Sequence, residues 1–111
     1  MRKVEPFFSV LIVNFNAGDL LQAAIDSLKI QTFRDFEVVI VDNDSEDQSA
    51  ENLDVEGLPA IRVLRENQNH GFARGNNLAA EAANGQWLAL LNPDAVADEN
   101  WLTEIHAATD V

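Results

Sequence analysis

The chain has 111 residues, 47% of them hydrophobic, and no cysteine, so we expect a single globular domain spanning residues 1–111, with neither a disulfide nor a thiolate metal site. Its formal net charge of −12 excludes nucleic acid and anionic lipid as expected direct partners. An anionic ligand would therefore need backbone amides, helix N-termini or a divalent metal. We expect no signal peptide, because Arg2 and Lys3 are soon followed by Glu5 and Pro6, and no apolar run is long enough to span a membrane.

Apolar runs alternate with helical patterns along the chain. We predict four strands, over residues 8–13, 36–41, 60–65 and 87–91. The third strand alternates and should be more exposed, whereas the fourth is nearly all apolar and is typical of a strand buried on both faces.

Helical patterns fill the segments between the strands. The first predicted helix covers residues 20–28 and begins with a capping box of Asp19 and Gln22, and a short, weak helix covers residues 46–52. An alanine-rich helix over residues 72–84 should be closed by Gly85, and a last helix, apolar from Trp101 to Ala108, should be capped by Asp98. This order predicts an α/β fold, a Rossmann-like three-layer sandwich with a mainly parallel sheet.

A polar cluster follows each predicted strand, which points to a shared crevice at the carboxyl edge of the sheet. Asp42 directly follows the second strand, and its carboxylate could accept hydrogen bonds from a nucleobase or a ribose. The alternative is an Asx-turn or a helix cap, for which Asp44 or Ser45 would serve equally well. On the residues alone the two interpretations are evenly balanced.

The segment from Asn69 to Asn77 opens the predicted third helix. Its glycines, Gly71 and Gly75, permit close backbone approach, and amides at a helix start attract anions. Arg74 adds a cation that could reach a phosphate. The alternative is a turn followed by tight helix packing. His70 and His106 lack a partner histidine at metal-ligand spacing, and we interpret them as a loop residue and a partly buried helix residue.

The fourth strand ends in Asn92, Pro93 and Asp94. A hard divalent cation prefers carboxylate oxygen, and one carboxylate plus ligand phosphates is enough to hold it. Asn92 could help through its own oxygen or through water. The alternative is an Asn-Pro-Asp turn, which its turn chemistry favours when the segment is considered alone.

Taken together, these segments resemble family 2 glycosyltransferases, of the rhamnosyltransferase-like branch, which use a nucleotide-sugar donor. The resemblance covers almost the whole chain, in order, through residues 9–16, 41–47, 69–77 and 90–95. It implies the N-terminal, nucleotide-binding half of a GT-A fold and a role in polysaccharide biosynthesis.

The resemblance also implies a role for each matching residue. Asp42 would contact the base or ribose, residues 13–15 would flank the base, and Arg74 would lie near the diphosphate or ribose. Asp94 would hold Mg²⁺ or Mn²⁺, as the second acid of an Asp-X-Asp motif whose first acid is Asn92 here. The implied nucleotide-binding residues are Val13, Asn14, Phe15, Asp42, Ser45, Gly71, Arg74 and Asn92, with Asp94 as the metal ligand.

The chain departs from the family in lacking the C-terminal half, which carries the carboxylate that deprotonates the sugar or glycolipid acceptor. Asp98, Glu99, Glu104 and Asp110 follow Asp94, but none matches that base, so no catalytic residue is assigned. We therefore expect the donor-binding half of a larger enzyme, or a fragment of one, that is inactive alone and self-associates through an exposed apolar edge. We expect a cytoplasmic location, at the inner face of the membrane in a full-length enzyme.

Other functional classes fit less well. A dinucleotide-binding oxidoreductase needs a G-x-G-x-x-G turn where residues 14–19 stand. A signalling receiver domain would need an acidic pair after the first strand, where Asn14 and Asn16 stand, and a lysine after a late strand, whereas no lysine follows Lys29. A nucleotide-sugar-binding module without catalysis stays open.

Overall fold

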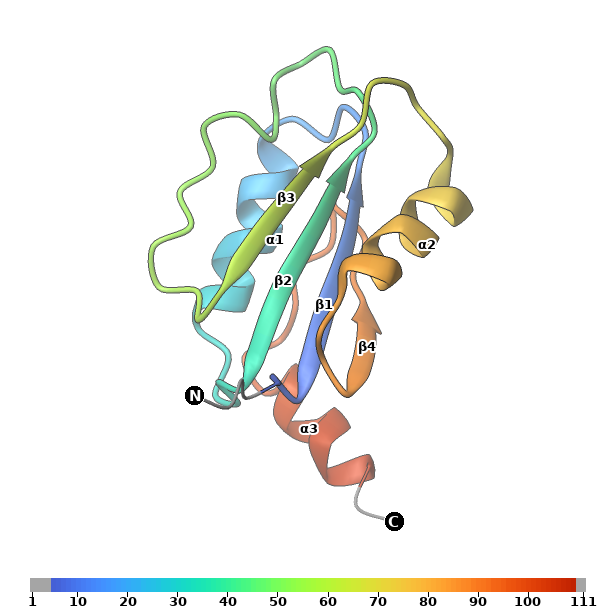
Figure 1. Cartoon of the computed structure of the whole chain (residues 1–111). Helices are drawn as coiled ribbons and strands as arrows, with labels where there is room; N and C mark the ends of the chain where they lie inside the picture. Colours follow the sequence, from blue (N-terminus) through green and yellow to red (C-terminus); the bar gives the residue numbers. More distant parts are fainter. Residues whose placement is uncertain (1–4, 110–111) are drawn as a thin grey trace, which may run out of the picture.

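The computed structural model describes residues 5–109 and contains one sheet of four parallel strands in the order β3-β2-β1-β4. The strands are β1 (Phe8–Asn14), β2 (Phe36–Asp42), β3 (Ile61–Arg65) and β4 (Trp87–Leu90). The helices are α1 (Asp19–Lys29), α2 (Phe72–Ala82) and α3 (Trp101–Ala108) (Figure 1). The basic residues Arg2 and Lys3, and Asp110, lie outside the described residues. The predicted α/β fold with a parallel sheet is confirmed.

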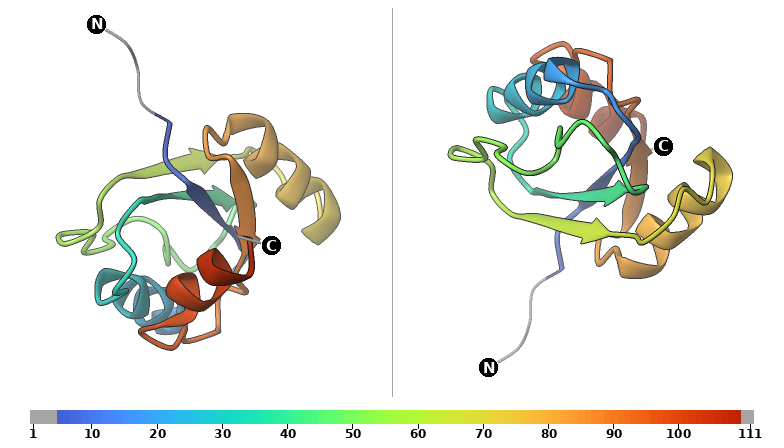
Figure 2. Two further views of the ribbon diagram at one scale, coloured as in Figure 1. Left: turned by 90° about the horizontal axis from the view of Figure 1, so that it is seen from below. Right: turned by 90° about the horizontal axis from the view of Figure 1, so that it is seen from above.

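The sheet is covered on both faces, so the sandwich has three layers. Helices α1 and α3 lie on one face and α2 lies on the other (Figure 2). Alternate residues of β1 supply the two cores: Val10 and Ile12 pack with Leu21, Ile25 and other residues of the α1 side, while the intervening residue Leu11 packs on the α2 side. Strands buried on both faces explain why β1 and β2 are nearly continuous apolar runs.

Strand β4 is not buried on both faces, which corrects the sequence prediction. Its side chains are half exposed at Trp87 (50%), Leu88 (47%) and Leu90 (54%), and only Ala89 is buried. The physical reason is its position: β4 is an edge strand that pairs with β1 alone, and α2 packs against β1 and β2. Strand β3, at the other edge, is partly exposed as predicted.

The predicted helix over residues 46–52 is wrong, because this segment consists of turns. Asp44 and Gln48 have positive φ angles of 59°, which a right-handed helix does not allow. The amide N–H of Ser49 donates to Oδ1 of Asp47 over 2.9 Å instead of to a helical carbonyl. Side-chain acceptors thus compete with the helix for the backbone donors.

The predicted helix ends also need correction. Gln22 does not close a capping box with Asp19, since α1 begins after Gly18 without a side-chain cap, and the Gln22 side chain bonds the backbone of Asp54 instead. The N-cap of α3 is Asn100, whose N–H donates to Oδ1 of Asp98 in an Asx-turn.

Gly85 does not close α2, which ends at Ala82 with an extended Ala83 behind it. A Cβ at Gly85 would lie 2.5 Å from both the backbone N and Oγ of Ser9. The glycine is therefore needed where the chain enters β4 against the backbone of β1.

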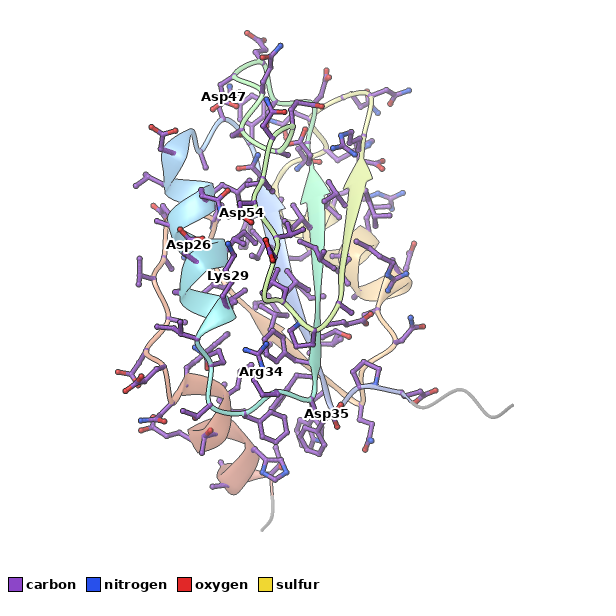
Figure 3. The ribbon with its side chains drawn as sticks, turned by 90° about the vertical axis from the view of Figure 1, so that its left-hand side faces the viewer. Asp26, Lys29, Arg34, Asp35, Asp47 and Asp54 are labelled. Atoms are coloured by element: carbon purple, nitrogen blue, oxygen red, sulfur yellow. The ribbon has the colours of Figure 1, made fainter. Side chains whose placement is uncertain are left out.

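Two polar clusters connect the elements: one joins the strands to the end of α2, and the other joins α1 to the loop before β3. Burial alone would raise the pKa of Glu37, but hydrogen bonds from Ser9 Oγ and the N–H of Asn84, with the charge of Arg62, outweigh burial and hold it below its ordinary range. On the α1 face, Lys29 pairs with Asp26 and Asp54 (Figure 3).

Between residues 5 and 109 no helix has both the length and the apolar character to cross a membrane.

Candidate functional site

The carboxyl ends of β1 and β2 hold a buried polar cluster built on Asp42. The parallel register places Asn14 opposite Asp42, so their side chains leave the two strands at the same level. Nδ2 of Asn14 donates to Oδ1 of Asp42 over 2.8 Å, and Oγ of Ser45 donates to the same oxygen over 2.7 Å. Oδ2 of Asp42 accepts only the long bond, 3.3 Å, from the N–H of Ser45. This second oxygen keeps capacity for a ligand N–H or O–H.

The loop after β2 is fastened to the loop after β1. Oδ1 of Asn16, a residue with φ of 53°, accepts the N–H of Glu46 over 2.8 Å. Oδ2 of Asp47 accepts the N–H of Gly18 over 2.8 Å, and hydrogen bonds from Ser49 hold the pKa of Asp47 below its ordinary range. Figure 3 shows Asp47 at the end of the sheet to which the strand arrows point. These bonds give the loops a defined shape at the sheet edge.

A hollow of about 250 Å³ lies beside this cluster, between the strand ends and the start of α2. Its lining combines apolar surface with two asparagines and consists of Val13, Phe15, Asn43, Asn69, Gly71, Phe72 and Pro93. The rings of Phe15 and Phe72 are 45% and 56% exposed. An apolar concavity with a few polar groups is the usual form of a small-molecule site, and exposed aromatic rings suit a planar base.

Helix α2 starts at the rim of this hollow and supplies a cation. Gly71 precedes the helix with φ of 84°, and Arg74 lies exposed in the first turn. Among the lysines and arginines of residues 5–109, Lys29, Arg62 and Arg65 are ion-paired and Arg34 bonds backbone carbonyls, whereas Arg74 has no such partner. Arg74 is therefore the cation available to an anionic ligand.

The Asn92-Pro93-Asp94 segment forms a turn, in which the N–H of Ala95 donates to the carbonyl of Asn92 over 3.0 Å. Pro93 lines the hollow, and Asp94, the next residue, is exposed. Asn92 lines a different hollow beside β4, together with Leu90 and Trp101. The segment is therefore a turn, and this geometry leaves the carboxylate of Asp94 exposed to solvent.

The donor set at Asp94 fits a divalent metal only if a ligand shares it. Residues 5–109 contain no cluster of three or more histidine, cysteine or acidic side chains that could hold an ion by themselves. The exposed carboxylate of Asp94 is a hard-oxygen ligand, and Mg²⁺ or Mn²⁺ can complete such a ligand with water and phosphate oxygens. The residues present therefore fit a metal held jointly by the protein and a diphosphate.

The structure brings most of the sequence-predicted residues to one edge of the sheet. Val13, Phe15 and Gly71 line the hollow, and Asn14, Asp42 and Ser45 form the cluster beside it. Asn92 lies apart from this hollow. Four other residues also line the hollow and were not predicted: Asn43, Asn69, Phe72 and Pro93. A glycine-rich helix start and a strand-end turn do not show which side chains point inward.

The sequence matches the family model described as Glycosyl transferase family 2 over residues 9–110. The chain is also 32% identical to a PGL/p-HBAD biosynthesis glycosyltransferase of Mycobacterium bovis over 91 residues, which are 80% of this chain and 36% of that protein. The family-model match therefore covers all the segments that form the site.

Two solved structures are similar in both sequence and fold. Staphylococcus aureus TarS residues 1–349 in complex with UDP-GlcNAc has 26% identity and a TM-score of 0.83, over 93% of this chain and 31% of that one. The mannosyltransferase PcManGT of Pyrobaculum calidifontis, in complex with GDP-Man and Mn²⁺, has 26% identity and a TM-score of 0.72, over 84% of this chain and 29% of that one. The chain thus spans about a third of the length of these proteins.

Proposed function

This chain belongs to glycosyl transferase family 2, and on that premise we propose that it is the donor-binding part of a metal-dependent, inverting glycosyltransferase. The substrate would be a nucleoside-diphosphate sugar, transferred to a hydroxyl of a sugar or glycolipid acceptor. The observation that carries the proposal is the hollow at the carboxyl edge of the sheet. Asp42, Arg74 and Asp94 do not line it, but each lies one or two residues along the chain from a lining residue.

Each part of the site has a chemical role in this proposal. The hollow with Phe15 and Phe72 would take the nucleobase, and Oδ2 of Asp42 would accept a hydrogen bond from the base or ribose. Arg74 would face the diphosphate as the unpaired cation of the described chain. A similar protein has been solved with GDP-Man and Mn²⁺, which supports a nucleotide-sugar and a divalent metal as the ligands to test first.

Asp94, with Asn92 nearby, would hold Mg²⁺ or Mn²⁺ through carboxylate oxygen. When bound, such a cation supplies Lewis-acid neutralisation of the negative charge on the leaving diphosphate. Such a cation would allow a chain with net charge −12 to bind an anionic ligand. Since the protein provides a single acidic ligand there, we expect metal affinity to be low without the nucleotide.

No described residue is proposed as the base that deprotonates the acceptor. Asp98 bonds the backbone of Asn100 in the turn before α3, and Glu99 and Glu104 are exposed. We therefore propose that the 111 residues bind a donor but do not turn it over. Sugar transfer by the purified chain, measured by release of nucleoside diphosphate in the presence of acceptor, would contradict this.

The binding proposal is tested by calorimetric titration of UDP and GDP in Mn²⁺. We expect one of them to bind with a stoichiometry near one, and binding to weaken when Mn²⁺ is replaced by EDTA. The competing proposal is a non-catalytic nucleotide-binding or signalling α/β module. Metal-independent binding of the same nucleotides would favour it. A cytoplasmic location is part of our proposal and is tested by cell fractionation.

We also propose that the purified chain self-associates through the outer edge of β4. That edge is unpaired within the described residues and carries Trp87, Leu88 and Leu90, half exposed and uncharged. Edge strands without charge or proline pair readily with a second copy. Sedimentation equilibrium should show a dimer that strengthens with salt, because each copy is strongly acidic, and Leu88→Lys should abolish it. A monomer at all salt concentrations would contradict the proposal.

A further inference from the structure

Asn43 is a buried asparagine that the roles assigned above do not use. It follows Asp42 at the end of β2, is 1% exposed, and lines the hollow. Its backbone N–H donates to the carbonyl of Asn14 over 2.9 Å, which continues the pairing of β1 and β2 by one residue. Its side chain is therefore fixed at the point where both central strands end.

The side chain of Asn43 connects the sheet to the start of α2. Its Nδ2 donates over 3.1 Å to the carbonyl of Gly71, which also accepts the helical N–H of Gly75 over 3.0 Å. The first acceptor of the helix is thus shared between the helix and the sheet. Within residues 5–109, this side-chain hydrogen bond links the end of β2 to Gly71, the residue before α2.

The packing around this bond is tight. A Cβ at Gly75 would lie 2.6 Å from Cγ1 of Val13 and 3.1 Å from Nδ2 of Asn43, so the first turn of α2 sits directly on the strand ends. Gly71 has φ of 84°, and a Cβ added there would meet no atom within 4 Å, so this position lacks the close contact found at Gly75. Hydrogen bonds hold its backbone instead: the N–H of Gly71 donates to Oδ1 of Asn69 over 2.9 Å, and its carbonyl accepts the bond from Asn43, which is the one that comes from the sheet.

The other half of the Asn43 amide is unsatisfied. Its Oδ1 is buried and has no hydrogen-bond partner among the described residues. A buried acceptor without a donor costs free energy, which an apolar side chain of the same size would avoid. An asparagine placed here despite that cost indicates that its donor bond to Gly71 serves the site.

We propose that Asn43 is a positioning residue for the diphosphate of the donor: it holds the first turn of α2, and with it Arg74, at the rim of the hollow. The inference rests on the proposed function, since it needs Arg74 to meet an anionic ligand there. Asn43 acts through the helix start and needs no contact with the diphosphate itself.

The test is a double-mutant cycle with Asn43→Ala and Arg74→Ala, measured as the dissociation constant for UDP or GDP in Mn²⁺. If Asn43 acts by placing Arg74, each single variant should weaken binding about tenfold, while Arg74→Ala should cost less than about threefold when Asn43 is already alanine. A merely structural role for Asn43 would not produce this coupling. Asn77→Ala, an exposed asparagine on the same helix, is the matched control and should bind like the wild type.

The outcomes separate the two proposals. If the wild type binds neither nucleotide, the proposed function is wrong and the role of Asn43 falls with it. If the wild type binds but the two losses multiply independently, or Asn43→Ala binds normally, only the positioning role is overturned. Cooperative melting of Asn43→Ala and Asn43→Ser is expected; failure of both to fold would make Asn43 a folding residue and overturn the proposal.

Discussion

Replacing Gly75 by alanine tests how closely α2 is seated on the sheet. The added Cβ would lie 2.6 Å and 3.1 Å from Cγ1 and Cγ2 of Val13, and 3.1 Å from Nδ2 of Asn43. Carbon atoms in contact are ordinarily about 3.5–4.0 Å apart. Since Val13 is held in a central strand, the start of α2 must move away by roughly 1 Å.

The expected magnitude is the difference between two opposing terms. Overpacking a core costs about 1–3 kcal/mol, and three contacts this short put Gly75→Ala in the upper part of that range, about 2–3 kcal/mol. Alanine is favoured over glycine in a helix by about 1 kcal/mol. The unfolding free energy should therefore fall by about 1–2 kcal/mol, and nucleotide affinity should fall with it, because the helix start borders the hollow.

Urea unfolding, followed by circular dichroism at 222 nm, measures the change, with Val13→Ala and the double variant as partners. Val13→Ala removes both methyl groups that the new Cβ would meet, at a cost of about 1.5 kcal/mol or more. In that background only the 3.1 Å contact with Nδ2 of Asn43 remains, so Gly75→Ala should cost clearly less than it does in the wild type. Additive losses in the double variant would refute the seating of α2 on Val13.

Three further predictions concern stability. The folded state holds the pKa of Glu37 below its unfolded value of about 4.3, so the ionised carboxylate stabilises the protein above that pH, and this stabilisation is lost as pH falls through the folded pKa. In urea unfolding, Glu37→Gln should therefore lose less stability than the wild type between pH 5 and pH 3. An acid dependence equal to that of the wild type would count against this. Gly85→Ala should destabilise by about 2–3 kcal/mol, because its Cβ meets the backbone of Ser9; a melting temperature equal to that of the wild type would be incompatible with the close approach. Asp42→Ala should cost about 1–3 kcal/mol in urea unfolding through the lost bonds to Asn14 and Ser45; full stability would show that the cluster is not structural.

Periodicity and composition predicted the fold because the central strands obey simple rules. β1 and β2 are apolar on both faces, and helical patterns separate the strands, so a parallel sheet with helices on both faces follows. β4 has the same apolar pattern and is nevertheless an edge strand with half-exposed side chains. An apolar sequence allows a strand to be buried on both faces, but it does not show whether another strand or helix covers each face.

The errors in local structure share a cause. The segment after Asp42 carries residues that would suit a helix, but its amides bond the side chains of Asn16 and Asp47, which come from the two loops being joined. Gly85 resembles a helix cap in sequence, but it serves a close contact with Ser9, 76 residues away in the chain. Contacts between segments that are distant in the chain determine the local structure at these positions, and such contacts cannot be inferred from a single sequence.

The candidate site was predictable to the level of the sheet edge. Topology brings the carboxyl ends of parallel strands together, so Asp42 and the helix start near Gly71 were expected to be neighbours. The sequence did not reveal that Asp42 is half engaged by Asn14 and Ser45, or that Asn43 holds the helix start, since both depend on side-chain geometry.

The most direct test of a metal-assisted donor site is titration of UDP and GDP into the purified chain, with and without Mn²⁺, for the wild type and Asp94→Ala. Glu99→Ala, which removes another exposed carboxylate from the segment after β4, is the matched control. We predict metal-dependent binding that is retained in Glu99→Ala and lost in Asp94→Ala, with both variants as stable as the wild type. Binding that is indifferent to Mn²⁺ and to Asp94, or no binding at all, would contradict a metal-assisted donor site at this edge of the sheet.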